Sequence, residues 1–157
     1  MVLYYTGSSL VWDYAPGSVI NYTFLNVSSA TLANYTSTYQ KVANIGTVSK
    51  LQASSRLKVT YYGRIKVNSV TGTGGYFELR VDDAATTNGR ANANFRADEV
   101  GYTGGVTVCI SGVFTGLSAG TRTISMWVRA SGSGTGTGAQ INPGSWAGDY
   151  IIVEEIK

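Results

Sequence analysis

Apolar and polar residues alternate along residues 57–68, with Leu57, Val59, Tyr61, Gly63, Ile65 and Val67 at the odd positions. The even positions are mostly polar, and the pattern holds for twelve residues. A period of two predicts a β-strand with one buried face and one solvated face. The same alternation predicts strands at residues 77–82 and 123–129.

Less regular apolar runs extend this pattern over most of the chain. They predict further strands at residues 10–14, 19–25, 39–48, 91–97, 106–114 and 150–156. Turn-rich stretches separate these runs, and no window shows a sustained 3.6-residue period. At most one helical turn is expected, near residues 30–35. The chain is therefore predicted to be all-β, an antiparallel jelly-roll sandwich of about 8–10 strands.

The length of 157 residues predicts a single domain over residues 1–157. Residues 1–32 are less strictly patterned, and two interpretations stay open for them: an attachment arm or a pair of edge strands. Residues 131–138 read SGSGTGTG, a composition typical of flexible linkers. Because this stretch lies between two predicted strands, we expect a mobile surface loop there.

The composition excludes several common kinds of catalytic site. The sequence has no histidine and a single cysteine, Cys109, which excludes an internal disulfide, Ser-His-Asp catalysis and His-ligated zinc. Glycoside hydrolysis needs only two carboxylates, but Glu78 and Asp82 on one strand would lie about 13 Å apart, too far for either hydrolase geometry. No Asp-X-Asp-X-Asp pattern indicates calcium. The expectation is a protein that is not an enzyme and holds no metal or cofactor.

The distribution of charged and apolar residues argues against nucleic-acid and membrane partners. The net charge is +3, and the nearest approach to a basic patch is Arg56, Lys58, Arg64 and Lys66 on one predicted strand. Nucleic-acid binders usually carry a denser basic stripe, so no nucleic-acid partner is expected. No apolar run approaches about 18 residues, and the start lacks the pattern of a signal peptide, so membrane insertion and secretion are not expected either.

Aromatic residues supply the candidate binding surfaces. The chain has eleven tyrosines and three tryptophans, whose flat amphipathic rings suit protein contacts and sugar stacking. Trp127 alternates with Ile124, Met126 and Val128, so it should face away from the core. Trp127 and Arg129 are therefore candidates for a subunit interface. Trp146, Tyr102 and Tyr62 are candidates for binding a glycan or a partner.

Residues 113–156 resemble the closing half of small jelly-roll domains of bacteriophage surface proteins. The segments that carry the resemblance are GLSAGT at 116–121, TISMWVR at 123–129, NPGSW at 142–146 and IIVEE at 151–155. Such domains occur at tail-fibre tips, in minor tail proteins and in related virion-surface proteins, and broadly resemble the C1q and tumour-necrosis-factor fold. No active-site motif belongs to this resemblance.

The resemblance implies a homotrimer on the virion surface, either a capsid decoration protein or the tip of an attachment fibre. Its implied partners are the major capsid protein or tail and fibre proteins, and a host cell-surface glycan. The unusually low share of charged residues, 13% against about 25% in ordinary domains, agrees with a surface that is partly buried by assembly. Two alternatives remain: a carbohydrate-binding module or lectin, and a two-carboxylate glycosidase.

Overall fold

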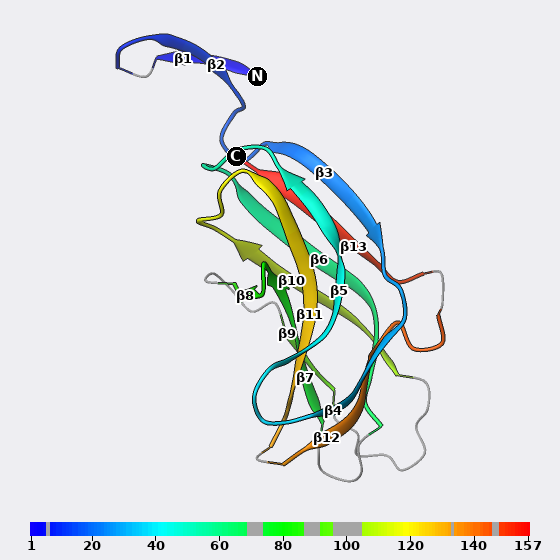
Figure 1. Ribbon diagram of the computed structural model, residues 1–157. Helices are drawn as coiled ribbons and strands as arrows, with labels where there is room; N and C mark the ends of the chain where they lie inside the picture. Colours follow the sequence, from blue (N-terminus) through cyan, green and yellow to red (C-terminus); the bar gives the residue numbers. More distant parts are fainter. Residues whose placement is uncertain (6, 69–73, 87–91, 96–104, 133, 146–147) are drawn as a thin grey trace.

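The computed structural model describes residues 1–5, 7–68, 74–86, 92–95, 105–132, 134–145 and 148–157, and it is built from β-strands (Figure 1). The strands are β1 (Val2–Tyr5), β2 (Leu10–Asp13), β3 (Val19–Asn26), β4 (Ala30–Tyr35), β5 (Gln40–Lys50), β6 (Arg56–Lys66), β7 (Gly75–Val81), β8 (Ala84–Ala85), β9 (Asn92–Phe95), β10 (Val106–Phe114), β11 (Gly120–Ala130), β12 (Gly136–Ile141) and β13 (Tyr150–Ile156). No helix in these ranges has the length and apolar character needed to cross a membrane.

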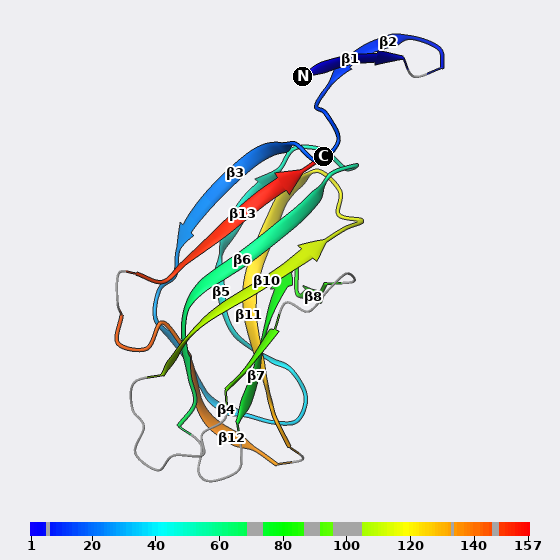
Figure 2. The same ribbon diagram turned by 180° about the vertical axis from the view of Figure 1, so that it is seen from behind.

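Two antiparallel sheets face each other across the core (Figures 1 and 2). The first sheet has the order β3-β13-β6-β12-β4, and β10 pairs with the other edge of β6. The second has the order β5-β11-β7-β8, with β9 also paired to β7. The all-β prediction is confirmed, and the two facing sheets are consistent with a sandwich. The jelly-roll connectivity stays a prediction.

The alternation of residue types in the sequence is the alternation of burial in the structure. Along β6, Leu57, Val59, Tyr61, Gly63 and Ile65 are buried while the residues between them are partly or fully exposed. β7 and β13 show the same period of two. The inward side chains of both sheets form one hydrophobic core, which is the main favourable contribution to folding.

Residues 30–35 form strand β4, so the helical turn expected there is wrong. β4 pairs with β12 and ends in Tyr35, whose ring is fully buried. Its hydroxyl donates a hydrogen bond to the Gly74 carbonyl at 3.4 Å, and burial raises its pKa to about 12. Pairing with a neighbouring strand and burial of one side chain therefore decide this segment, and neither is visible in its local sequence.

The mobile loop expected at residues 131–138 is also wrong in part, because β12 begins at Gly136. A Cβ atom at Gly136 would collide with the Tyr35 ring, and one at Gly138 would collide with the Asn68 amide. These two glycines therefore allow a close approach between chain segments. A glycine-rich sequence is compatible with either role, which is why composition alone indicated a linker.

Strands β1 and β2 pair as a hairpin that projects beyond one end of the sandwich (Figures 1 and 2). β3 follows as an edge strand of the first sheet, paired with β13. Residues 1–32 thus include one edge strand, β3, with a projecting hairpin before it. An attachment role for that hairpin is a prediction.

A buried polar cluster joins the end of β5 to the end of β13. The Glu155 carboxylate is 1% exposed and accepts hydrogen bonds from the backbone N–H groups of Leu51 and Gln52, at 2.7 and 2.9 Å, and from the Ser55 hydroxyl. The buried Lys50 ammonium donates to Ser55 Oγ at 2.9 Å. Burial alone would raise the pKa of Glu155, but these hydrogen bonds and the Lys50 charge outweigh it and hold that pKa below its usual value.

This depressed pKa predicts a loss of stability in acid. The folded state binds the Glu155 proton more weakly than the unfolded state, so its contribution is present above the usual carboxyl pKa and lost as pH falls through the folded value. Glu155→Gln should cost about 2 kcal/mol at neutral pH, and the difference from wild type should shrink below about pH 4. Urea unfolding at several pH values measures this.

Glu154→Gln is the matched control for this prediction. The adjacent Glu154 forms a partly exposed ion pair with Lys58 at 2.7 Å, so its loss should cost less than about 1 kcal/mol. Equal losses for the two variants at neutral pH would contradict the assignment.

Candidate functional site

Three aromatic rings stack across the outer face of the first sheet. Phe24 on β3, Tyr150 on β13 and Tyr62 on β6 follow one another, with ring centroids 5.2 Å apart for Phe24 and Tyr150 and 5.6 Å apart for Tyr150 and Tyr62. The interplanar angles are 24° and 20°. We call this row the aromatic ladder. Phe24 is 50% exposed and Tyr62 is 46% exposed, so the row borders solvent.

Strand register puts the rings side by side. Tyr150 lies directly opposite Tyr62 on β6 and Asn26 on β3, which makes Phe24, two residues from Asn26, its diagonal neighbour. Direct and diagonal partners on one face of an antiparallel pair are close enough for large rings to touch. Cys109 of β10 lies opposite Tyr62 in turn and is exposed. The ladder therefore depends on the pairing of three strands from distant parts of the chain.

The neighbours of the ladder extend its apolar character and then give way to polar groups. Tyr22, 58% exposed, is two residues from Phe24 on the same face, and Ile152 lies opposite Phe24. We call these two residues and the ladder together the ladder surface. The Lys58–Glu154 ion pair lies on the same face of the sheet. An apolar centre with polar neighbours is the usual anatomy of a protein interface.

The orientation of the rings limits what this surface can bind. Tyr150 has another ring stacked against each of its two faces. A sugar stacks on a free aromatic face, whereas a protein surface packs equally well against ring edges. The ladder surface therefore suits a protein partner better than a bound saccharide along the row.

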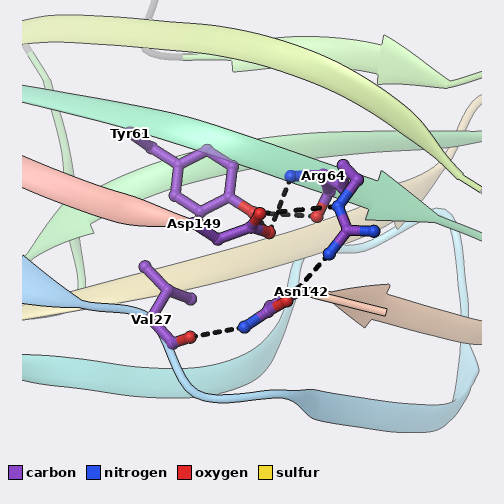
Figure 3. A network of polar contacts seen from close by, with 5 residues as sticks. All are labelled: Val27, Tyr61, Arg64, Asn142 and Asp149. Carbon is purple, nitrogen blue, oxygen red and sulfur yellow. Dashed lines mark hydrogen bonds and ion pairs between the residues drawn. The ribbon is translucent and has the colours of Figure 1, made fainter. Parts of the chain in front are cut away.

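A buried polar network fixes the start of β13, where Tyr150 lies (Figure 3). The Asp149 carboxylate, 5% exposed, accepts a hydrogen bond from the Arg64 backbone N–H at 2.8 Å and lies 3.5 Å from the Arg64 guanidinium. That guanidinium also donates to the Asn142 amide oxygen at 3.1 Å, and the Asn142 NH₂ donates to the Val27 carbonyl at 2.7 Å. The Tyr61 hydroxyl donates to the Arg64 carbonyl at 2.8 Å.

This network ties together segments that are far apart in sequence. Val27 follows β3, Arg64 lies on β6, and Asn142 and Asp149 belong to the segment between β12 and β13. Burial and the nearby Asp149 charge raise the pKa of the Tyr61 phenol well above its usual value, so it stays a neutral donor. The network holds β3, β6 and β13 in the register that the ladder requires.

Trp127 lies on the outer face of the second sheet, with its ring half-buried by cations of its own chain. Its indole N–H donates to Ser125 Oγ at 2.9 Å. The Arg80 guanidinium lies 4.4 Å from the ring centroid, and the Lys41 ammonium lies 5.4 Å from it. Contacts of this kind contribute about 0.5–1 kcal/mol each at exposed sites.

Arg129 belongs to the same face. Its guanidinium lies 4.4 Å from the Tyr76 ring centroid and 5.4 Å from that of Tyr39. Burial and the neighbouring Glu78 carboxylate raise the pKa of Tyr39. Trp127 and Arg129 are therefore parts of one cation–π cluster that packs against the second sheet.

The structure does not bring the predicted site residues together. Tyr62 lies in the aromatic ladder of the first sheet, whereas Trp127 and Arg129 lie on the outer face of the second, across the core. Trp146 and Tyr102 lie outside the described residues. Their binding roles stay predictions, and so does the subunit-interface role of Trp127 and Arg129.

The carboxylates expected on one strand face are arranged differently. β7 ends at Val81, and Asp82 lies in a turn with a φ of 50°, so Glu78 and Asp82 do not share a strand as expected. Asp82 pairs with Arg122 at 2.8 Å, and Glu78 pairs with Arg80 at 2.8 Å. Positive φ is tolerated by aspartate in tight turns, and that backbone change ends the alternation.

Asp83 follows in the same turn and forms an ion pair with Lys41 at 2.7 Å, which holds the pKa of Asp83 below its usual value. Within the described ranges, no cluster of three or more His, Cys, Asp or Glu side chains offers a metal site.

Sequence reasoning missed most of the ladder surface. Tyr22 and Phe24 alternate with Thr23 and Leu25, which is a signal of one face shared by two exposed rings. The partnership of Phe24, Tyr150 and Tyr62 needed the order of β3, β13 and β6, which no local pattern supplies.

The polar network predicts a steric requirement at Gly63, on the β6 face that carries Tyr61. A Cβ atom there would lie 2.8 Å from Asp149 Cγ and 2.8 Å from Tyr61 Cζ. Gly63→Ala should therefore displace Asp149 and destabilise the fold by about 1–3 kcal/mol. Guanidinium unfolding measures this loss. Gly132→Ala is the control, because nothing lies within 4 Å of the added methyl group; equal stability of the two variants would refute the requirement.

Two comparisons with known proteins found no relative of this chain: no family model matches it, and a search of curated proteins finds no significant match.

Proposed function

We propose that this protein is a non-enzymatic structural protein of a bacteriophage particle surface that works as an assembly of identical copies, with a trimer as the expected form. The ladder surface is the observation that carries the assembly part of this proposal. Tyr22, Phe24 and Tyr62 are each about half exposed and lie together on one sheet face. Contiguous exposed aromatic surface of this kind marks interaction sites in soluble proteins.

The low charge of the chain supports the same proposal. Only 13% of its residues are charged, about half the ordinary share. Interface centres are depleted in charge and enriched in tyrosine, tryptophan and phenylalanine. A protomer that buries part of its surface against sister copies and a particle needs fewer charged groups there.

The virion setting rests on the resemblance of residues 113–156 to phage surface domains. The described parts of that segment include β11, β12 and β13 of an all-β fold, which is compatible with such a domain. Capsid decoration and fibre-tip attachment are equally compatible with this all-β fold. Labelling of the head or of the tail in electron micrographs of the particle distinguishes the two roles.

Carbohydrate binding is the second candidate, and the exposure of Tyr62 at one end of the ladder favours it. Tyr150 covers one of the two faces of the Tyr62 ring. The face turned away from Tyr150 is the surface on which a single sugar ring would stack.

The main proposal predicts that the protein sediments at about three times its chain mass of 16.6 kDa and that gold-labelled antibody decorates particles of the phage that encodes it. A stable monomer that labels no particle would refute the proposed function.

Sedimentation also tests the expectation that Trp127→Asp weakens assembly more than it unfolds the protomer, since burial of one tryptophan is worth about 3 kcal/mol at a packed contact. Intact trimers in that variant would refute the placement of Trp127.

The second candidate predicts hits on a glycan array that weaken at least tenfold on Tyr62→Ala, because loss of the ring on which a flat ligand stacks typically costs about 1–3 kcal/mol. Leu51→Ala, which removes an exposed apolar side chain elsewhere, is the control. An array without hits, or binding that survives Tyr62→Ala, would eliminate this candidate.

A further inference from the structure

One face of the projecting hairpin consists entirely of large apolar side chains. In the β1–β2 register, Leu3 lies opposite Trp12 and Tyr5 lies opposite Leu10. Because alternate residues share a face, these four side chains lie together, and they are 47% to 67% exposed. We call them the hairpin face.

The hairpin lacks the cover that such a face needs. Among the described strands, β1 and β2 pair with each other and with no third strand. A two-stranded hairpin alone in water is marginally stable, and it gains stability when a hydrophobic face packs against another surface. Four exposed apolar side chains on two four-residue strands therefore indicate an element that docks.

Most of the exposed large apolar side chains in the described part of the chain lie in two places. Eleven large hydrophobic side chains are exposed in the described residues. Six belong to the first twelve residues and four to β3 and β6, three of them in the ladder surface; Leu51 is the exception. The hairpin face carries no charge, and the ladder surface is uncharged as well. The two surfaces therefore match in character.

The hairpin is held away from the ladder of its own chain. Asp13 at the end of β2 forms an ion pair with the Lys157 ammonium at 2.6 Å. The Gly17 N–H donates to the Lys157 carbonyl at 2.7 Å, and the Lys157 N–H donates to the Ser18 carbonyl at 3.0 Å. These contacts fix the base of the hairpin at the end of the sandwich where the chain ends (Figures 1 and 2). β3 begins beside that base and runs toward the other end of the sandwich (Figure 1), and Phe24 is its sixth residue.

We propose that the hairpin face of one copy docks on the ladder surface of a second copy. The contact is head-to-tail: each copy gives its hairpin to one neighbour and accepts a hairpin from another. A heterologous contact of this kind closes into a ring when the rotation allows, and a three-fold ring joins three copies by three identical contacts. The inference rests on the proposed assembly function and names the surfaces that perform it.

The exposed areas of the two surfaces set the size of such a contact. Large apolar side chains present about 200 Å² each when free, so at the observed exposures the hairpin face offers about 500 Å², and Tyr22, Phe24 and Tyr62 of the ladder surface offer about 300 Å². One contact then buries about 800 Å², below the roughly 1,000 Å² of a stable specific interface, so a single contact is weak and a closed ring of contacts is needed. Each copy in a ring makes two such contacts.

Paired variants test this arrangement by sedimentation. The hairpin variant carries Leu10→Ser and Trp12→Ser, and the ladder variant carries Tyr22→Ser and Phe24→Ser. Each alone should be monomeric, with its assembly dissociation constant raised at least thirtyfold. A mixture should form a one-to-one dimer, because the intact hairpin of the ladder variant can still dock on the intact ladder of the hairpin variant.

Two further variants complete the design. Leu51→Ser removes an exposed large apolar side chain that lies outside both surfaces and should assemble like the wild type. Tyr62→Ser replaces the ladder variant if circular dichroism shows that the double substitution unfolds the protein.

The outcomes separate the two proposals. A dimer in the mixture, with monomers in each variant alone, supports the head-to-tail contact. Oligomers that persist in both variants overturn the contact and leave the assembly function standing. A monomeric wild type that nevertheless labels phage particles overturns the contact and the assembly part of the proposed function and leaves the particle-surface role standing, and a monomer that labels none overturns both proposals.

Discussion

Consecutive residues of a β-strand point to opposite faces of the sheet, and the first sheet depends on that constraint at Tyr61 and Tyr62 of β6. Tyr61 points into the core and donates its hydroxyl proton to the network around Arg64 and Asp149. Tyr62 points outward and ends the aromatic ladder. Two adjacent residues of one type thus have opposite environments, and β6 pairs with three other strands to make both possible.

Buried carboxylates clamp β13 at both ends. Asp149 precedes its first residue and holds Arg64 of β6, whereas Glu155 lies next to its last residue and holds the segment after β5. Each carboxylate accepts backbone N–H groups, which satisfies donors that would otherwise be buried without partners. The strand is thereby fixed in register against both of its neighbours. That register aligns the ladder, so the buried polar groups shape a surface that they do not touch.

The sequence predicted the strands whose alternation is local and missed the features that depend on pairing. The alternating segments at residues 57–68 and 77–82 overlap β6 and β7, because each segment alone shows its two faces. β4 was mistaken for a helical turn, since its strand character comes from β12 and from the burial of Tyr35. The outward position of Trp127 followed from alternation. The stacking of Tyr150 on Tyr62, and of Phe24 on Tyr150, could not be predicted in this way, because it depends on the pairing of β13 with both β6 and β3.

Cys109 is the only cysteine of the chain, and its exposed position opposite Tyr62 has a practical consequence. A fluorophore attached to that thiol would be alone on the molecule and would lie at the border of the aromatic ladder. Its emission colour and lifetime would change as the water around it is displaced. The natural protein therefore already contains a single reporter position for whatever covers this face.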